Sequence, residues 1–320
     1  MSCGRIALER ADIEVNKYYA SELDKYAIKV TQANWPETIQ LGDVTRWREW
    51  DIDWSSIDLL IGGSPCQGFS FAGKQLAFDD PRSKLFFVYV DILNHIKSVN
   101  PGIKFLLENV KMKKEYLDVI SDYLGVKPVF INSALVSAQN RQRYYWANWE
   151  FGQPQDKGVM LVDIIESDVD DKFYLSEKLL AGFYAKKERR KEKKSGFDKL
   201  NVSDLNGKAN CLTARYHKMS MSDPYILQRP RGNNPGGERA LNGKTPSMTA
   251  NSWHENNYVS LRGLIRKLTP IECERLQTAP DNYTSHVSNT QRYKMLGNGW
   301  TVDVIAHIFK NLTPKPTINI

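Results

Sequence analysis

Four side chains near the ends of predicted strands could together carry out covalent chemistry on a ring. Cys66 follows the apolar run 57–61, Glu108 follows a second apolar run, and Arg141 and Arg143 stand close to a third. A thiolate can attack a ring, a carboxyl group can protonate the ring as it is attacked, and guanidinium groups can donate hydrogen bonds to it. Most lone cysteines are small buried hydrophobes, so the case for Cys66 depends on these companions.

The loop that carries Cys66 is stiff at its start. Two glycines end the preceding strand, and Ser64 and Pro65 stand directly before the cysteine. Pro65 fixes its own φ angle and restricts Ser64, which limits the paths open to the chain. Open α/β sheets bind their ligands at the carboxyl ends of strands, so we expect the thiol at that edge.

Strands and helices alternate over residues 1–150, which predicts an α/β fold with a doubly wound, mostly parallel sheet. We expect strands at 14–22, 38–43, 57–61, 104–107, 128–136 and 143–148. We expect helices within 1–9 and at 24–34, 83–97, 175–185, 269–277 and 298–309, with one more after residue 110.

Two acidic residues at predicted strand ends, Glu22 and Asp43, could bind a nucleoside. In doubly wound sheets such carboxylates accept hydrogen bonds from ribose hydroxyls or from an exocyclic amine. Acids at strand ends are also common caps, so this signal alone is weak.

Composition limits the class of protein. The chain has 320 residues, 41% hydrophobic and 25% charged, which is ordinary for a globular protein. We find no apolar run of membrane-spanning length and no signal peptide. The four cysteines form no CxxC pair, which argues against a metal site or disulfides and favours a reducing compartment. The net charge of +7 suggests a polyanionic partner.

The character of the sequence changes after residue 151. The segment 186–194 is strongly basic and is either a solvated helix face or a contact to phosphates. The segments 207–214 and 243–250 form a degenerate repeat, and aromatic residues and a histidine follow each copy. Two short strands that end in such loops favour a surface that reads a polymer, although they could equally be two strands of a small β domain.

Five blocks of this sequence, in this order, resemble the motifs of the DNA (cytosine-5)-methyltransferases over nearly the whole chain. The blocks are Pro65-Cys66-Gln67, Glu108-Asn109-Val110, the segment 139–143 (Gln-Asn-Arg-Gln-Arg), the segment 266–277, and Gly297-Asn298-Gly299, which we expect to open the last helix.

The resemblance implies transfer of a methyl group from S-adenosyl-L-methionine to C5 of a specific cytosine in double-stranded DNA. The cytosine is flipped out of the duplex, and the Cys66 thiolate adds to C6. Glu108 contacts N3 and the exocyclic amine, and Arg143 holds O2 with Arg141 nearby. The base that removes the C5 proton is not identified, and water is as good a candidate as a side chain.

The resemblance also assigns the domains and the partners. Residues 1–152 with 295–320 form the catalytic and cofactor-binding domain, and 153–294 form a mainly β and loop target-recognition domain with a hinge. We expect a monomer in the cytoplasm of a bacterium or a phage-infected cell, with no membrane partner. A cognate restriction endonuclease, not physically bound, is left open, as is the target sequence.

The remaining site residues follow from the same resemblance. The cofactor-binding residues are Met1, Ser2, Cys3, Glu22, Leu23, Asp43, Val44, Pro65 and Asn298. The DNA-binding residues are Gln67, Ser70, Lys74 and Arg82 after the nucleophile, and Arg215, Lys218, Asn251 and His254 as readers of base edges.

Features of the sequence bear on three other functions. A tRNA methyltransferase of the same fold would carry a Cys-Phe-Thr signature in its later part, which we do not find. A DNA-binding protein without activity would have lost Cys66, Glu108 or Arg143. A cysteine hydrolase needs a histidine partner, and none of the five histidines falls among the strand-end motifs.

The sequence departs from the family at its start. The family begins with a hydrophobic strand that runs into Phe-x-Gly, whereas Met1 already stands in the following turn. That strand lies at the centre of the sheet, between the strands that end at Glu22 and near Cys66. We therefore expect a truncated reading of a longer frame, with marginal folding, weak cofactor binding and little activity.

Overall fold

The computed structural model describes residues 1–63, 84–176, 178–183, 185, 202–219, 224–227, 265–312 and 317–320. Several predictions fall outside these residues. They concern the basic segment 186–194, the second repeat copy 243–250, and the site residues Pro65, Cys66, Gln67, Ser70, Lys74, Arg82, Asn251 and His254.

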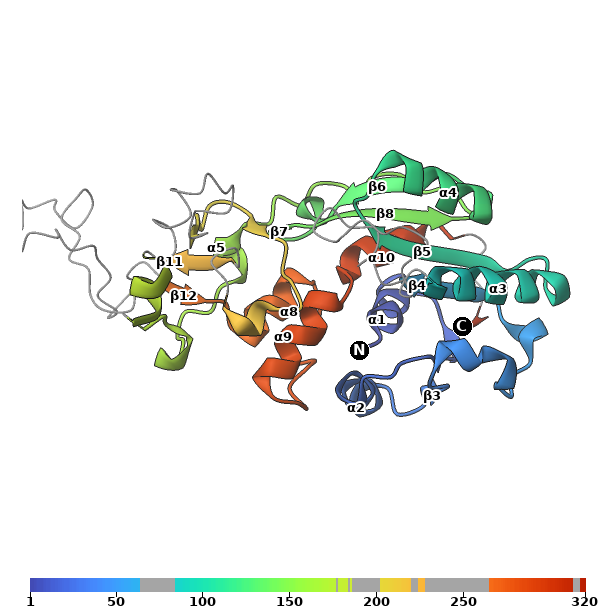
Figure 1. Ribbon diagram of the computed structural model, residues 1–320, viewed down its shortest axis with the longest axis horizontal. Helices are drawn as coiled ribbons and strands as arrows, with labels where there is room; N and C mark the ends of the chain where they lie inside the picture. Colours follow the sequence, from blue (N-terminus) through green and yellow to red (C-terminus); the bar gives the residue numbers. More distant parts are fainter. Residues whose placement is uncertain are drawn as a thin grey trace, which may run out of the picture.

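The main sheet has four strands in the order β4 (Leu59–Gly63), β5 (Lys104–Val110), β8 (Gln142–Ala147) and β6 (Val129–Asn132) (Figure 1). β4 and β5 are parallel, whereas β8 runs antiparallel to both β5 and β6. The predicted strand 104–107 extends to Val110, which places Glu108 inside β5. The predicted strand 128–136 stops at Asn132, whose side chain accepts from the Ala134 amide and starts a 3-10 turn, Ser133–Leu135.

Helices cover both faces of this sheet, because β5 is apolar on both sides. Phe105 and Leu107 face a cluster built by α3 (Lys84–Val99) and α4 (Lys114–Leu124). Leu106 faces the opposite cluster, which contains α1 (Cys3–Arg10) and α10 (Val302–Lys310). Alternate residues of a strand point to opposite faces, so this arrangement confirms the doubly wound α/β fold.

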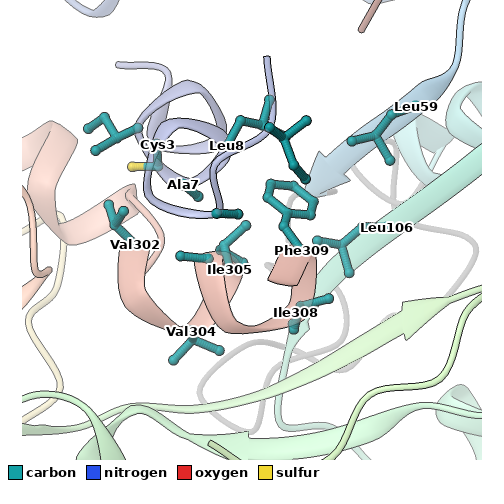
Figure 2. Packing of buried hydrophobic residues seen from close by; sticks show 14 of the residues in the cluster. Cys3, Ala7, Leu8, Leu59, Leu106, Val302, Val304, Ile305, Ile308 and Phe309 are labelled. Atoms are coloured by element: carbon teal, nitrogen blue, oxygen red, sulfur yellow. The ribbon is translucent and has the colours of Figure 1, made fainter. Parts of the chain in front are cut away.

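α1 and α10 pack against each other beneath β4 and β5. Figure 2 shows Ala7 and Leu8 of α1 beside Ile305 and Phe309 of α10, with Leu59 of β4 at the edge of the same cluster. All five side chains are fully buried. The first and last helices of the chain therefore form one layer of the core.

Short parallel strand pairs continue the sheet beyond β4. The predicted strand 14–22 is split into β1 (Val15–Lys17) and β2 (Tyr19–Ala20). β2 pairs with β3 (Ile39–Gln40), and β1 pairs with the C-terminal strand β13 (Ile318–Asn319). The predicted helix 24–34 is confirmed as α2 (Lys25–Asn34), whose first turn the Asp24 side chain caps.

β13 lies where the sequence analysis places a missing central strand. Ile318 donates its backbone N–H to the Glu14 carbonyl at 3.0 Å on one side. On the other side, the Asp58 N–H donates to the Asn319 carbonyl at 2.9 Å, directly before β4. The strands on either side, which were expected to leave backbone groups without hydrogen-bond partners, thus bond to the C-terminal segment.

The expectation that Gly297-Asn298-Gly299 opens the last helix is wrong. Asn298 is the last residue of α9 (Asn289–Asn298), and α10 begins only at Val302. Gly299 donates its N–H back to the Met295 carbonyl at 2.8 Å and then takes an extended conformation, which ends α9. The three residues are therefore the end of one helix and the start of a turn.

The remaining elements lie at the end of the molecule opposite α3 (Figure 1). They are α5 (Leu161–Ile164), a helical segment at 178–183, and the sheet β12 (Ile265–Lys267), β11 (Tyr225–Leu227) and β9 (Val202–Ser203). The first repeat copy contains β10 (Ala209–Asn210), which pairs with β7 (Gln139–Asn140).

The predicted helix 269–277 is confirmed as α8 (Pro270–Leu276), with Pro270 in its first turn and a capping box between Thr269 and Glu272. Within the described residues, no helix is both long and apolar enough to span a membrane.

Candidate active site

Two adjoining cavities lie at the carboxyl ends of β2, β3, β4 and β5. Their volumes are about 370 Å³ and about 950 Å³. Glu22, Gly62, Gly63, Asn298 and Trp300 line both of them. This is the edge at which open α/β sheets bind ligands.

Glu108 and Arg143 face each other in the larger cavity. Glu108 is paired with Tyr145 across β5 and β8, and Arg143 is paired with Val110. The two side chains are therefore diagonal neighbours on one face of the sheet. The Arg143 Nε lies 2.7 Å from the Glu108 Oε1, and both side chains are largely buried. The sequence predicted both residues at one edge of the sheet, and the register of β5 against β8 explains why they meet.

Trp300 completes the surroundings of Glu108, and sequence reasoning missed it. Its indole Nε1–H donates to the Glu108 Oε2 at 3.1 Å. Burial raises the pKa of Tyr145, and the negative charge of Glu108 raises it further, so the phenol beside the carboxylate is neutral. The available signal for Trp300 was its position directly after Gly297-Asn298-Gly299.

Arg141 lines the larger cavity, but its guanidinium donates hydrogen bonds to loops. Its side chain is buried, and its terminal nitrogens donate to four acceptors from two distant parts of the chain. The acceptors are the Cys211 Sγ at 3.2 Å and the carbonyls of Leu212 at 3.1 Å, Gly297 at 3.3 Å and Gly299 at 2.8 Å. Arg141 thus ties the first repeat copy to the loop between α9 and α10.

The described residues assigned to the cofactor lie around the two cavities. Met1, Ser2 and Cys3 line the smaller one, and Leu23, Asp43 and Val44 line the larger one. Burial raises the pKa of the Cys3 thiol, so this cysteine lines the cavity as a neutral thiol and is not a nucleophile.

Two carboxylates are held in place at strand ends. The Glu22 Oε1 accepts the backbone N–H groups of Leu23 at 2.8 Å and Asp24 at 2.9 Å. The Asp43 Oδ1 accepts the backbone N–H of Thr45 at 2.9 Å and its hydroxyl at 2.8 Å. These bonds to Thr45 lower the pKa of Asp43, which keeps the carboxylate ionised.

The two described candidates for base readout lie far from Glu108 in sequence and on the surface. Arg215 and Lys218 are exposed at either end of the 3-10 turn Tyr216–Lys218. Tyr216 itself is buried and donates its hydroxyl to the Pro224 carbonyl at 2.7 Å. The aromatic residue after the first repeat is therefore an anchor, and the two basic residues flank it.

The nucleophile itself lies outside the described residues, but the strand that leads to it does not. β4 ends at Gly63, three positions before Cys66, and Gly63 lines both cavities. Across the part of the chain that the structure describes, no cluster of three His, Cys, Asp or Glu side chains could hold a metal ion.

Comparisons with known proteins show the family of the chain. The family model described as C-5 cytosine-specific DNA methylase matches residues 2–314. The Type II methyltransferase M1.ScrFI of Lactococcus lactis subsp. cremoris is 33% identical over 93% of this chain and 72% of its own length. M.HpaII of Haemophilus parainfluenzae is 32% identical over 93% of this chain and 83% of its own length.

Solved structures share the fold. The methyltransferase EhMeth of Entamoeba histolytica superposes with a TM-score of 0.64 at 19% identity, over 97% of this chain and 93% of its own. A DNMT2 variant from Spodoptera frugiperda gives 0.63 at 22% identity, over 96% and 95%. At these identities the likeness shows the fold alone.

Proposed function

The chain belongs to the C-5 cytosine-specific DNA methylases and transfers a methyl group from S-adenosyl-L-methionine to C5 of cytosine in DNA; we propose that it does so through a covalent adduct of Cys66. The observation that carries the mechanism is the Glu108–Arg143 pair, 2.7 Å apart, beside the end of the strand that leads to Cys66. An acid and a guanidinium in one partly closed cavity provide the groups that a cytosine needs at N3 and O2.

The described cavities fit the cofactor in size and chemistry. Their volumes of about 370 and 950 Å³ are in the range of small-molecule sites. Glu22 and Asp43 offer carboxylate acceptors for hydroxyl and amine groups, and Met1, Ser2, Cys3, Leu23, Val44, Pro65 and Asn298 would enclose the ligand. When bound, S-adenosyl-L-methionine supplies the methyl group.

The chain's own residues would act on a cytosine flipped out of the duplex. The Cys66 sulfur forms a bond to C6 and pushes an electron pair towards C5. Glu108 gives its proton to N3 and accepts from the exocyclic amine, while Arg143 donates to O2. After C5 takes the methyl group, N3 returns its proton to Glu108, the C5 proton passes to water or to a side chain, and the C6–S bond breaks to release the thiolate, which restores the ring.

Arg141 has a different task in this proposal. Its guanidinium is engaged by the carbonyls of Leu212, Gly297 and Gly299. We assign it the positioning of the turn that follows Asn298, and we leave contact with the base to Arg143.

We propose that 1–152 with 295–320 form the catalytic domain and that 153–294 read the target. The hydrophobic clusters support this division, since those around α10 and α3 are built mainly from the first and last parts of the chain. Arg215 and Lys218 would contact DNA, together with Gln67, Ser70, Lys74, Arg82, Asn251 and His254. Exchange of 207–259 for the matching region of a relative should change the target sequence, and retention of the original target would place readout elsewhere.

The wider setting is also a proposal. Relatives named as Type II methyltransferases, from bacteria, support a role beside a restriction endonuclease in the bacterial cytoplasm. A relative named as an orphan methyltransferase from Bacillus phage SPR, 28% identical, supports a solitary role in a phage-infected cell equally well. We propose that the protein acts as a monomer on double-stranded DNA.

A mechanism-based trap tests the proposal. DNA with 5-fluorocytosine at the target should form a covalent adduct, because fluorine cannot leave as a proton does. Cys66→Ala should form none and should still bind the target DNA. An active preparation that forms no adduct would rule out attack by Cys66, and methylation of tRNA instead of DNA would favour the other substrate class.

A further inference from the structure

Each oxygen of the Glu108 carboxylate has its own partner, a cation at one and a hydrogen-bond donor at the other. The Arg143 Nε lies 2.7 Å from Oε1, and the Trp300 Nε1–H donates to Oε2 at 3.1 Å. One partner is a flexible cationic side chain, and the other is a neutral ring. The two oxygens are therefore not equivalent.

The Trp300 ring packs against its surroundings and has fewer rotatable bonds than an arginine side chain. A Cβ added at Gly63 would lie 3.1 Å from its Nε1, and one added at Gly4 would lie 3.7 Å from its Cζ3. The indole therefore packs closely against Gly63 at the end of β4 and lies within van der Waals reach of the first turn of α1. It also packs against the cluster that Figure 2 shows.

Binding of a cytosine must change one of these two contacts. The base needs a proton at N3 and an acceptor for its amine, so one oxygen must carry a proton and the other must accept. Arg143 is the partner that can leave, because the base's O2 requires its guanidinium. Its departure frees Oε1, whereas Oε2 keeps the indole N–H and has a second lone pair for the amine.

We propose that Trp300 is a positioning residue that fixes Oε2 of Glu108 as the acceptor and leaves Oε1 as the oxygen that delivers the proton to N3. The inference rests on the proposed mechanism, in which Glu108 protonates the ring. It adds a fixed orientation of the carboxyl group, without which either oxygen could carry the proton. Trp300 does not touch the reacting atoms in this scheme.

Removal of the N–H alone tests this role. Trp300 is replaced by β-(3-benzothienyl)alanine, whose sulfur stands where the N–H was and whose ring has nearly the same shape. Trp149 provides the matched control, since its Nε1–H donates to the Ile308 carbonyl, also at 3.1 Å, and its ring packs against the same core cluster. Both proteins are compared with the unmodified enzyme in single-turnover methyl transfer, cofactor binding, DNA binding and thermal unfolding.

We expect the rate constant of the Trp300 protein to fall about tenfold to hundredfold, the range for one hydrogen bond to a charged group. Dissociation constants for DNA and cofactor should change less than about twofold, and the Trp149 protein should keep its rate. In a Glu108→Gln background the Trp300 replacement should cost less than about threefold, because an amide cannot deliver the proton from either end.

Other outcomes have distinct meanings. An unchanged rate, or equal loss in the Glu108 and Gln backgrounds, would overturn the role of Trp300. A fall in unfolding temperature that matches the loss of rate would reduce Trp300 to a structural residue and would also overturn it. If Glu108→Gln alone keeps full activity, the proposed mechanism fails before the inference is reached.

Discussion

The C-terminal strand β13 should be essential for folding, although it is very short. Its deletion would remove backbone partners from both neighbouring strands and two buried side chains from the core. The four hydrogen bonds are Ile318 N–H to Glu14 O, Ile320 N–H to Lys17 O, Tyr19 N–H to Ile320 O, and Asp58 N–H to Asn319 O. Ile318 and Ile320 are 1% and 7% exposed.

The cost can be worked from these contacts. Each backbone group that loses its hydrogen-bond partner costs about 1 kcal/mol, and truncation of a buried isoleucine about 2 kcal/mol at the low end. Four groups and two side chains therefore cost about 8 kcal/mol, within the roughly 5–15 kcal/mol that stabilises a domain. Deletion of 317–320 should leave little folded protein at room temperature.

A graded variant keeps the test quantitative. Ile318→Ala should lower the free energy of unfolding by about 2–5 kcal/mol in urea, followed by tryptophan fluorescence. Thr317→Ala is the control, because Thr317 is exposed and should change the free energy by less than about 0.5 kcal/mol. Ile320 lines the larger cavity. Calorimetric titration of the same proteins with S-adenosyl-L-methionine therefore also tests the prediction of weak cofactor binding. Deletion of 317–320 without a shift of the urea midpoint would refute the reasoning.

Two further predictions concern the loops around the site. A Cβ at Gly297 would lie 2.1 Å from the Thr213 backbone, so Gly297→Ala should lower the unfolding temperature measured by calorimetry. Gly152→Ala is the control and should leave this temperature unchanged, because nothing lies within 4 Å of a Cβ at Gly152. Equal unfolding temperatures for the two variants would contradict this packing. Asp43 has a lowered pKa, so its stabilising contribution is present above its unfolded value of about 3.9 and is lost as the pH falls through the folded value. Thr45→Val removes one of its hydrogen bonds and should raise the midpoint of the Asp43 carboxyl carbon in an NMR titration, and an unmoved midpoint would exclude the hydroxyl as a cause.

Local signals in the sequence predicted local structure well. Asp24 caps α2, and Thr269 with Glu272 forms the capping box of α8, because such bonds join residues a few positions apart. Glu108 and Arg143 were also predicted at one edge of the sheet. Both stand on strands of one sheet, and adjacent strands bring their faces together.

Contacts between distant parts of the chain could not be predicted. The bond from Trp300 to Glu108 joins residues 192 positions apart, and no periodicity encodes it. β13 is another example, since two paired residues near the C-terminus carry too little pattern to mark a central strand. The break between α9 and α10 was missed because Gly299 can end one helix as readily as it can precede another.

The two arginines of the segment 139–143 show why spacing alone does not assign a role. A spacing of two places side chains on one face of a strand, and both were predicted at the site. β8 begins at Gln142, however, so Arg143 keeps the strand geometry that points it at Glu108, whereas Arg141 does not. Arg141 instead reaches carbonyls of the first repeat copy and of the loop after α9, to which a planar guanidinium can donate in several directions at once. A lysine at 141 would offer three donors on one nitrogen in place of the five of a guanidinium, so Arg141→Lys should weaken the link between the first repeat copy and the turn after α9.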